Sequence, residues 1–246
     1  MSGRLSSFLA LGFVFFCLPS SAQDKTLLVA AASDLSAVGP ELRAAFCKVP
    51  TTCPVRFVNG SSAALAQQID HGAQFDLFLS ANEGFVDRLA SNGKIDHGSV
   101  KAYAIGRLGV LWRDGKKHPL RELSTPAARY LALPNPKLAP YGAAAQQALE
   151  YAGLWGMVQS KVVYGENVRQ ALQLLESGNA DAVITSDSLL QGKDAELIPA
   201  DWHKPIVQKA GIVAASQNRG GAQRFLEFLL GPAGEGILAK YGFGRP

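Results

Sequence analysis

The chain has 246 residues, which is long enough to bury a full hydrophobic core as one large domain or two smaller ones. Its 48% hydrophobic and 18% charged residues are typical of a folded globular protein and exclude wholesale disorder. The net charge is only +4, and the lysines and arginines form no dense run or aromatic-basic stripe, so we expect no nucleic-acid partner.

The first 22 residues have the pattern of a secretory signal peptide. Arg4 precedes an apolar stretch over Phe8–Leu18, and the small residues Ser20 and Ala22 follow it. The apolar stretch is too short to span a bilayer, and small residues at these positions are typical of a cleavage site. We therefore predict cleavage after Ala22 and export of the mature chain, which in a bacterium means the periplasm.

Cleavage would leave two cysteines, Cys47 and Cys53, separated by a short loop that contains Pro50. Two nearby cysteines in an oxidising compartment favour a disulfide, and we predict one between them. Two free thiols are the alternative. A disulfide here would act as a loop staple and has no redox role in this prediction.

Strand and helix patterns alternate from the start of the mature chain. Strands are expected at Thr26–Ala31, Val55–Val58 and Asp76–Leu79, and helices around Ser36–Phe46, Ala63–His71 and Glu83–Ser91. The strands are nearly all apolar, which is typical of a parallel sheet covered on both faces. A long extended segment then follows at Lys101–Trp112.

The alternation starts again after this segment and ends with a second extended run. Strands are expected at Tyr130–Leu133, Lys161–Tyr164 and Asp181–Thr185, helices at Ala143–Gly153 and Val168–Ser177, an extended run at Pro205–Ser216, and two final helices at Ala222–Leu230 and Ala233–Tyr241. The pattern predicts a two-lobed α/β fold in which each lobe is a mostly parallel sheet flanked by helices and two crossover strands join the lobes. Lobe 1 would comprise residues 23–104 and 206–246, lobe 2 residues 105–205, and a ligand would lie in the cleft between them.

At four places a strand runs through small polar residues into a helix. These junctions are Thr26–Asp34, Val55–Ser62, Tyr130–Gly142 and Val162–Val168. The first turn of a helix has unpaired N–H groups and the positive end of the helix dipole. Several helix starts that converge would therefore form an anion site without a charged side chain.

The serines at the first two junctions have two interpretations. Ser33 could donate its hydroxyl to an anion or simply cap the following helix. The segment from Asn59 to Ser62 favours anion binding, because two serines open a helix whose first turn has no acidic residue to offset the dipole.

Asp76, Asp181 and Asp187 lie at strand ends, and their expected role is loop bonding rather than cation binding. The four histidines lie far apart and lack the spacing of a zinc site. No histidine lies near a junction serine, which argues against an exported hydrolase that uses Ser33 or Ser62.

Six segments in order resemble one family: AAASDL at 30–35, NGSSAALAQQI at 59–69, FDLFLSAN at 75–82, ENVRQAL at 166–172, ADAVITSDS at 180–188 and FLLGPAGEGILAKYGF at 228–243. They resemble the periplasmic molybdate-binding proteins of ABC transporters, which are type II periplasmic binding proteins. The resemblance extends from about Thr26 to Phe243. It implies a binding protein, not an enzyme, that takes molybdate or tungstate without a cofactor and delivers it to an ABC permease and its ATPase. We expect it to act as a monomer.

The resemblance also implies the ligand-binding residues. Molybdenum would be held only as molybdate, through its oxygens, by the Ser33 and Ser62 hydroxyls and the N–H groups of Tyr141 and Val168, with the Asp34 N–H group assisting. Members of the family often have a tyrosine that donates its hydroxyl to the anion where this chain has Ile184. One donor to the anion is therefore missing here, unless Thr185 or another group replaces it. The Asp34 carboxylate must point away from a dianion or cap its own helix. The first alternative is a binding protein of the same fold that takes sulfate, phosphate or an organic anion. A less favoured alternative is the effector lobe of a transcriptional regulator, and the predicted signal peptide argues against it.

Overall fold

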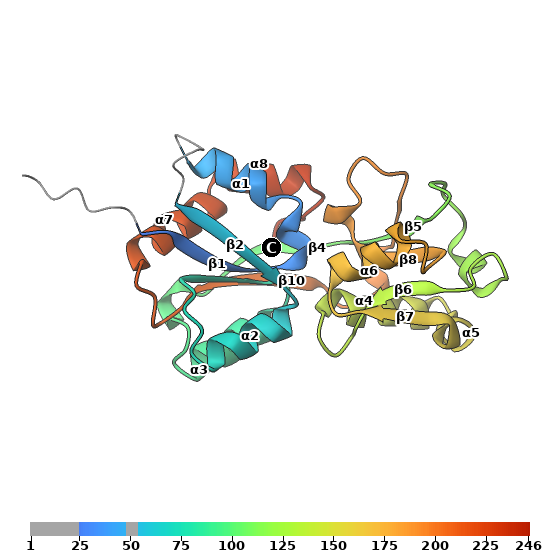
Figure 1. The fold of residues 1–246 in the computed structure, drawn as a ribbon, viewed down its shortest axis with the longest axis horizontal. Helices are drawn as coiled ribbons and strands as arrows, with labels where there is room; N and C mark the ends of the chain where they lie inside the picture. Colours follow the sequence, from blue (N-terminus) through green and yellow to red (C-terminus); the bar gives the residue numbers. More distant parts are fainter. Residues whose placement is uncertain (1–24, 48–53) are drawn as a thin grey trace, which may run out of the picture.

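The computed structural model describes residues 25–47 and 54–246, which form two α/β lobes (Figure 1). The predicted signal peptide and its cleavage site lie outside the described residues. Cys47 is disulfide-bonded, and its predicted partner Cys53 also lies outside the described part of the chain.

The first lobe is built on a five-stranded sheet in the order β2-β1-β3-β10-β4. Its strands are β1 (Leu27–Ala32), β2 (Val55–Gly60), β3 (Leu77–Ser80), β4 (Lys101–Gly106) and β10 (Ile206–Ile212). Strands β2, β1 and β3 are parallel, whereas β10 is antiparallel to both β3 and β4. The predicted parallel βαβ arrangement is therefore correct for the first half of this lobe.

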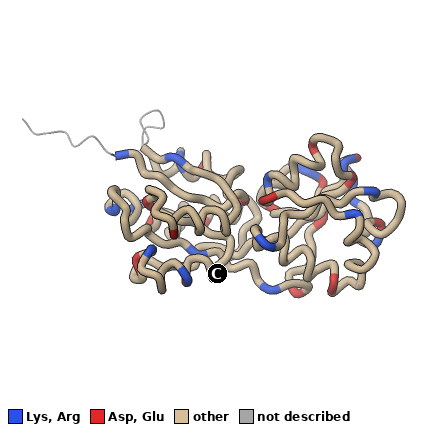
Figure 2. The backbone as a smooth tube through the Cα atoms, turned by 60° about the horizontal axis from the view of Figure 1, so that its bottom comes forward, with Lys and Arg blue, Asp and Glu red and all other residues tan. Residues whose placement is uncertain are grey.

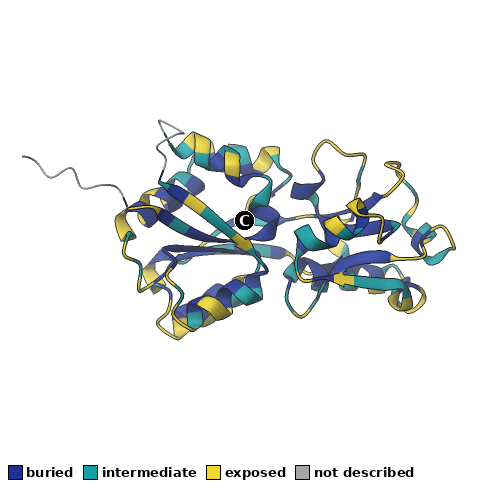
Figure 3. Ribbon diagram, in the orientation of Figure 1, coloured by how far each residue is buried: buried dark blue, intermediate teal, exposed yellow. Residues whose placement is uncertain are grey.

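Helices cover both faces of this sheet, which explains why its inner strand β1 is entirely apolar and β3 nearly so (Figure 3). Helices α1 (Gly39–Phe46), α7 (Arg219–Leu230) and α8 (Pro232–Lys240) cover one face, and α2 (Ser62–Asp70) and α3 (Glu83–Ser91) cover the other. In β1, Val29 and Ala31 belong to the core beneath the first group and Ala30 to the core beneath the second. Short 3-10 helices, η1 (Ser33–Ser36) and η3 (His97–Ser99), complete the lobe.

One expected helix, Ser36–Phe46, is divided in the structure. Residues Ser33–Ser36 form η1, and α1 begins only at Gly39. Pro40 lies in the first turn of α1. Proline has no N–H group and is tolerated only at a helix start, so the helix cannot extend back through it.

The second lobe repeats the sheet pattern of the first, in the order β7-β6-β8-β5-β9. Its strands are β5 (Leu108–Trp112), β6 (Leu131–Pro134), β7 (Val162–Gly165), β8 (Ala182–Ser186) and β9 (Glu196–Leu197). Its helices are α4 (Pro140–Tyr151), α5 (Trp155–Val158) and α6 (Val168–Glu176), with 3-10 helices η4 (Leu120–Ser124), η5 (Gln159–Lys161), η6 (Asp187–Leu189) and η7 (Ala200–Trp202). Again three strands are parallel, and β5 is antiparallel to its neighbours β8 and β9.

The chain passes between the two sheets twice. The extended segment expected at Lys101–Trp112 is two strands, β4 in the first sheet and β5 in the second, with Arg107 between them. The chain returns at β10, which lies between β3 and β4. The carboxyl ends of β1, β2, β6 and β7 lead into the pocket that the two lobes enclose. Ligands of open α/β sheets bind at such carboxyl ends.

Lys and Arg positions alternate with Asp and Glu positions along the backbone of both lobes, without a long run of one sign (Figure 2). Among the residues that the structure describes, no helix is both long and apolar enough to cross a membrane. The same residues contain no group of three or more His, Cys, Asp or Glu side chains arranged to hold a metal ion.

The carboxylates at strand ends bond loops, as predicted for Asp76 and Asp181. The Asp76 carboxylate accepts hydrogen bonds from the Leu28 N–H (2.8 Å), the Ser216 hydroxyl (2.7 Å) and the Asn218 N–H (3.2 Å). It thereby ties β1 to the segment that follows β10. Asp181 accepts from the N–H groups of Arg129 and Tyr130 in lobe 2.

Replacing Asp76 by alanine should lower the free energy of unfolding by about 2–3 kcal/mol, because it leaves several partly buried donors unpaired. Asp70→Ala is the matched control, since the Asp70 carboxylate pairs with Arg88 on the surface and should contribute about 0–1 kcal/mol. Urea unfolding of both variants measures the difference. Equal losses would contradict the role of Asp76 in joining these segments.

Candidate functional site

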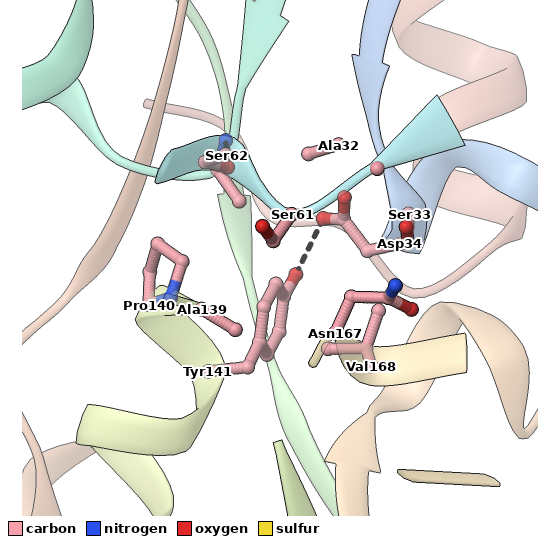
Figure 4. Close-up of a pocket in the computed structure, with 12 residues that line it drawn as sticks. Ala32, Ser33, Asp34, Ser61, Ser62, Ala139, Pro140, Tyr141, Asn167 and Val168 are labelled. Atoms are coloured by element: carbon pink, nitrogen blue, oxygen red, sulfur yellow. Dashed lines mark hydrogen bonds between the residues drawn. The ribbon is translucent and has the colours of Figure 1, made fainter. Parts of the chain in front are cut away.

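A small pocket lies between the two lobes (Figure 4). The residues around it share one property, because nearly all of them stand where a strand ends or a helix begins. They are Ala32, Ser33, Asp34, Gly60, Ser61, Ser62, Ala81, Ala139, Pro140, Tyr141, Asn167 and Val168. The structure therefore brings together all five residues that the sequence predicted for the site, and all four junctions contribute.

Helix α2 presents Ser62 to the pocket. Ser61 is the N-cap of this helix, and its hydroxyl accepts a hydrogen bond from the Ala64 N–H at 3.3 Å. Ser62 is the first helical residue, is only 1% exposed, and accepts a hydrogen bond from the Ala81 N–H at 3.0 Å. Because this bond occupies a lone pair, the proton of the Ser62 hydroxyl stays available for a ligand. The cap and the candidate donor are thus two different serines.

Helix α4 begins at Pro140, three residues before the expected start at Ala143. Proline fits the first helical position, and Ala139 before it has no side chain that could cap the helix. The Tyr141 N–H therefore lies in an uncapped first turn beside the pocket. Gly142 allows α4 to approach β6 closely, since a Cβ there would lie 2.1 Å from the carbonyl oxygen of Pro134.

Helix α6 is capped differently. The Asn167 side chain accepts hydrogen bonds from the N–H groups of Arg169 (3.0 Å) and Gln170 (3.1 Å). These bonds satisfy two of the first-turn donors and leave the N–H of Val168, the first helical residue, beside the pocket. Sequence reasoning did not assign this capping role to Asn167, although asparagine before a helix is a recognised capping signal.

The first junction places Ser33 and Asp34 in η1. Ala32, not Ser33, occupies the N-cap position of η1, and no side chain caps this 3-10 helix. The interpretation of Ser33 as a cap is therefore wrong. Its side chain lines the pocket instead.

Of the charged residues that the structure describes, Asp34 alone lines the pocket, and it is 1% exposed. Its Oδ2 atom accepts hydrogen bonds from the Tyr141 hydroxyl (2.8 Å) and the Gln208 side-chain amide (2.5 Å). Its Oδ1 atom is buried and has no hydrogen-bond partner. Burial raises the pKa of Asp34 from 3.8 to about 6, although the bonds from Gln208 and Tyr141 act in the opposite direction. The carboxylate bonds across the lobes, and the backbone N–H groups of Asp34 and Leu35 in its own 3-10 helix also act to lower its pKa.

Further contacts between the lobes surround Asp34, and sequence reasoning missed all of them. The Ser188 hydroxyl donates to the Asp34 carbonyl at 2.6 Å, and Ser188 itself contacts Ser186. The Ala63 N–H donates to the Leu138 carbonyl at 3.3 Å. The contacts of Ser188 with Asp34 and of Ala63 with Leu138 join residues more than 70 positions apart, so no local pattern could indicate them.

Ile184 lies outside the pocket. It is fully buried in β8, opposite Val110 of β5, and belongs to the lobe 2 core. Thr185 does not replace a ligand donor either, because its hydroxyl donates to the Val168 carbonyl at 2.9 Å. The expectation that Ile184 faces the ligand is therefore wrong. The tyrosine hydroxyl near the pocket belongs to Tyr141. Its position requires a glycine at residue 106, because a Cβ atom at Gly106 would lie only 2.2 Å from the Tyr141 hydroxyl oxygen.

Comparison with known proteins agrees with this geometry. The model of the family described as bacterial extracellular solute-binding proteins matches residues 27–244. The chain belongs to this family. Among curated relatives of this solute-binding protein, the molybdate-binding protein ModA of Azotobacter vinelandii is 32% identical, covering 92% of this chain and 93% of that protein. A putative ABC transporter substrate-binding lipoprotein, YvgL of Bacillus subtilis, is also 32% identical, covering 91% and 88% of the two chains.

Solved structures show the same two-lobed fold. The periplasmic molybdate-binding protein of Azotobacter vinelandii superimposes with a TM-score of 0.83 at 29% identity, covering 89% of this chain and 99% of that one. The sulfate-binding protein SubI of Mycobacterium tuberculosis has a TM-score of 0.70 at 18% identity, covering 90% and 86%, and shows likeness of fold alone.

The buried Asp34 should make this solute-binding protein less stable as the pH rises. Its pKa is higher in the folded state, so the folded protein binds more protons between about pH 4 and 6 and loses stability across that range. A shift of this size corresponds to roughly 3 kcal/mol at neutral pH.

Asp34→Asn removes the titration while preserving an oxygen acceptor for Tyr141 and Gln208. In denaturant unfolding without ligand, the variant should gain about 2–3 kcal/mol over the wild type at pH 7.5 and little at pH 4. The same difference at both pH values would contradict a buried, titrating carboxyl group.

Proposed function

We propose that this protein captures molybdate or tungstate between its lobes for import by an ABC transporter. The observation that carries the proposal is a pocket lined by serine hydroxyls and the starts of helices α2, α4 and α6, without a lysine, arginine or histidine. Such donors suit an oxyanion, because helix starts and hydroxyl groups donate hydrogen bonds to negatively charged oxygens. The molybdate-binding relatives that cover nearly the whole chain support the choice of oxyanion.

The donors are the Ser33 and Ser62 hydroxyls and the N–H groups of Tyr141 and Val168, with the Asp34 N–H assisting. They contact the oxygens of the anion, and each charge-assisted hydrogen bond contributes about 1.5–3 kcal/mol before entropy costs. The size of the anion provides selectivity. The two lobes hold the donors at a spacing that suits a large tetrahedral oxyanion, so the smaller sulfate makes longer and weaker hydrogen bonds.

The protein acts as a carrier without chemistry or a cofactor. We propose that it is exported with cleavage after Ala22, acts in the periplasm as a monomer, and delivers its ligand to an ABC permease and its ATPase. The helix starts and their serines orient a ligand, and no histidine lines the pocket to activate Ser33 or Ser62 as a nucleophile.

Phosphate binding by the same fold is the second candidate. The observation that favours it is Asp34, since a carboxylate in the pocket suits an oxyanion that carries its own proton, as phosphate does.

Titration calorimetry with molybdate, tungstate, sulfate and phosphate tests the choice. Molybdate and tungstate should bind and raise the melting temperature, because a ligand of the native state adds about 2.7 kcal/mol at a hundredfold excess over Kd. Binding of sulfate or phosphate, with no response to molybdate or tungstate, would contradict the proposal.

Ser62→Ala should weaken molybdate binding by about 1.5–3 kcal/mol, or roughly tenfold to a hundredfold in Kd, because alanine offers no donor to the charged ligand. It also leaves the Ala81 N–H unpaired, at a cost of about 1 kcal/mol in stability.

Asn218→Ala is the matched control for this variant. Asn218 caps α7 away from the pocket, so its loss should cost about 1 kcal/mol in stability and leave Kd unchanged. Equal Kd values for Ser62→Ala and the wild type would remove Ser62 from the site.

A further inference from the structure

The pocket contains an acid where the proposed ligand is a dianion. Within residues 25–47 and 54–246, Asp34 is the only charged residue that lines the pocket, and no Lys or Arg side chain of these residues lies there to offset it. Two like charges in a closed site repel one another strongly, because little solvent lies between them. If the proposed function is correct, on which this inference rests, one of the two charges must be neutralised when the anion binds.

The hydrogen bonds of Asp34 indicate where a proton would lie. The Oδ2 atom accepts from both the Tyr141 hydroxyl and the Gln208 amide, so its neighbours are donors. Gln208 is itself held by the Tyr103 hydroxyl, which donates to its Oε1 atom at 2.5 Å. Because Oδ2 already accepts two hydrogen bonds, we place the proton of a neutral Asp34 on Oδ1, which is buried and has no side-chain partner among the described residues.

An acid proton on Oδ1 needs an acceptor, and an oxygen of the bound anion would supply one. Asp34 lines the cavity beside Ser33, Ser61 and Ser62, opposite the starts of the two lobe 2 helices (Figure 4). We propose that Asp34 binds the oxyanion as a neutral carboxylic acid, so that the protein takes up one proton from solvent with each dianion. The acid then joins the serine hydroxyls and backbone N–H groups as a donor.

The surroundings of Asp34 allow this protonation. Tyr141 of α4 and Tyr103 of β4 are the titratable groups that face it, and the pKa of each is raised by burial and by the Asp34 charge, so both stay neutral. Charged side chains on the elements packed against η1 are engaged elsewhere or exposed and do not shift the pKa of Asp34. They are Glu41 and Arg43 of α1, Arg56 of β2, Arg169 and Glu176 of α6, and Asp187 of η6.

Burial already raises the pKa of Asp34 to about 6 in the empty pocket. A dianion beside the carboxyl group would raise it further. Asp34 is therefore ionised in the protein without ligand at pH 8 and protonated in the complex. Proton uptake on binding is largest at this pH. Below about pH 5 the carboxyl group is protonated in both states and uptake disappears.

Titration calorimetry with molybdate tests this directly, because molybdate stays a dianion from pH 5.5 to 8.5 and contributes no titration of its own. Measurements at pH 8 in two buffers of different ionisation enthalpy give the number of protons taken up, which should approach one per molybdate. The Kd should rise by about tenfold per pH unit above pH 6.5.

Asp34→Asn should supply a permanent amide donor at the same place. The variant should take up no proton, bind with a Kd independent of pH, and bind more tightly than the wild type at pH 8. Ser62→Ala is the matched control, since it should weaken binding equally at every pH and keep the slope of the wild type.

A wild-type Kd that is constant from pH 5.5 to 8.5, with no proton uptake, would overturn this inference and leave the proposed function standing. Failure of both molybdate and tungstate to bind at pH 5.5 would contradict the proposed function instead. If Asp34→Asn does not fold, the proton count of the wild type still decides.

Discussion

Backbone N–H groups in the first turn of a helix have no partner within the helix, and the site of this protein depends on bringing several of them together. Parallel sheets make this possible, because successive helices begin at the same edge of the sheet, where the strands end. Two such sheets face each other here, and α2 from one lobe meets α4 and α6 from the other at a single pocket. The positive ends of these three helix dipoles thereby meet at the pocket, which also contains the Asp34 carboxyl group.

Capping residues decide which of these donors remain for a ligand. Ser61 and Asn167 satisfy donors deeper in the first turns of α2 and α6, so that each helix start is stable and still presents a group to the pocket. Ser62 follows the same principle, because its hydroxyl accepts a bond from the protein and retains a proton to donate. At α2 and α6 the capping bonds thus use other residues than the ones that present a donor to the pocket.

Asp34 links the binding pocket to the contacts between the lobes. Its carboxyl group accepts from Tyr141 of lobe 2 and from Gln208 of β10, one of the strands by which the chain passes between the lobes. Its carbonyl accepts from Ser188 of lobe 2. A change in the charge of Asp34 therefore acts on the ligand and on the closed arrangement of the lobes at the same time. Within the proposed function, this couples capture of the anion to the protonation of a single buried group.

The sequence by itself determined the strand-helix alternation, the two-lobed fold and the junction residues around the pocket, because apolar periodicity and helix-start signals are local properties. It missed the start of α4 by three residues and the break at Pro40, since boundaries depend on which first-turn groups find partners. Only the tertiary structure decided the roles of Ile184 and Asp34. Ile184 is a core residue, and the Asp34 carboxyl group bonds to residues 107 and 174 positions away. Burial and charge are properties of such distant neighbours, and no local pattern contains them.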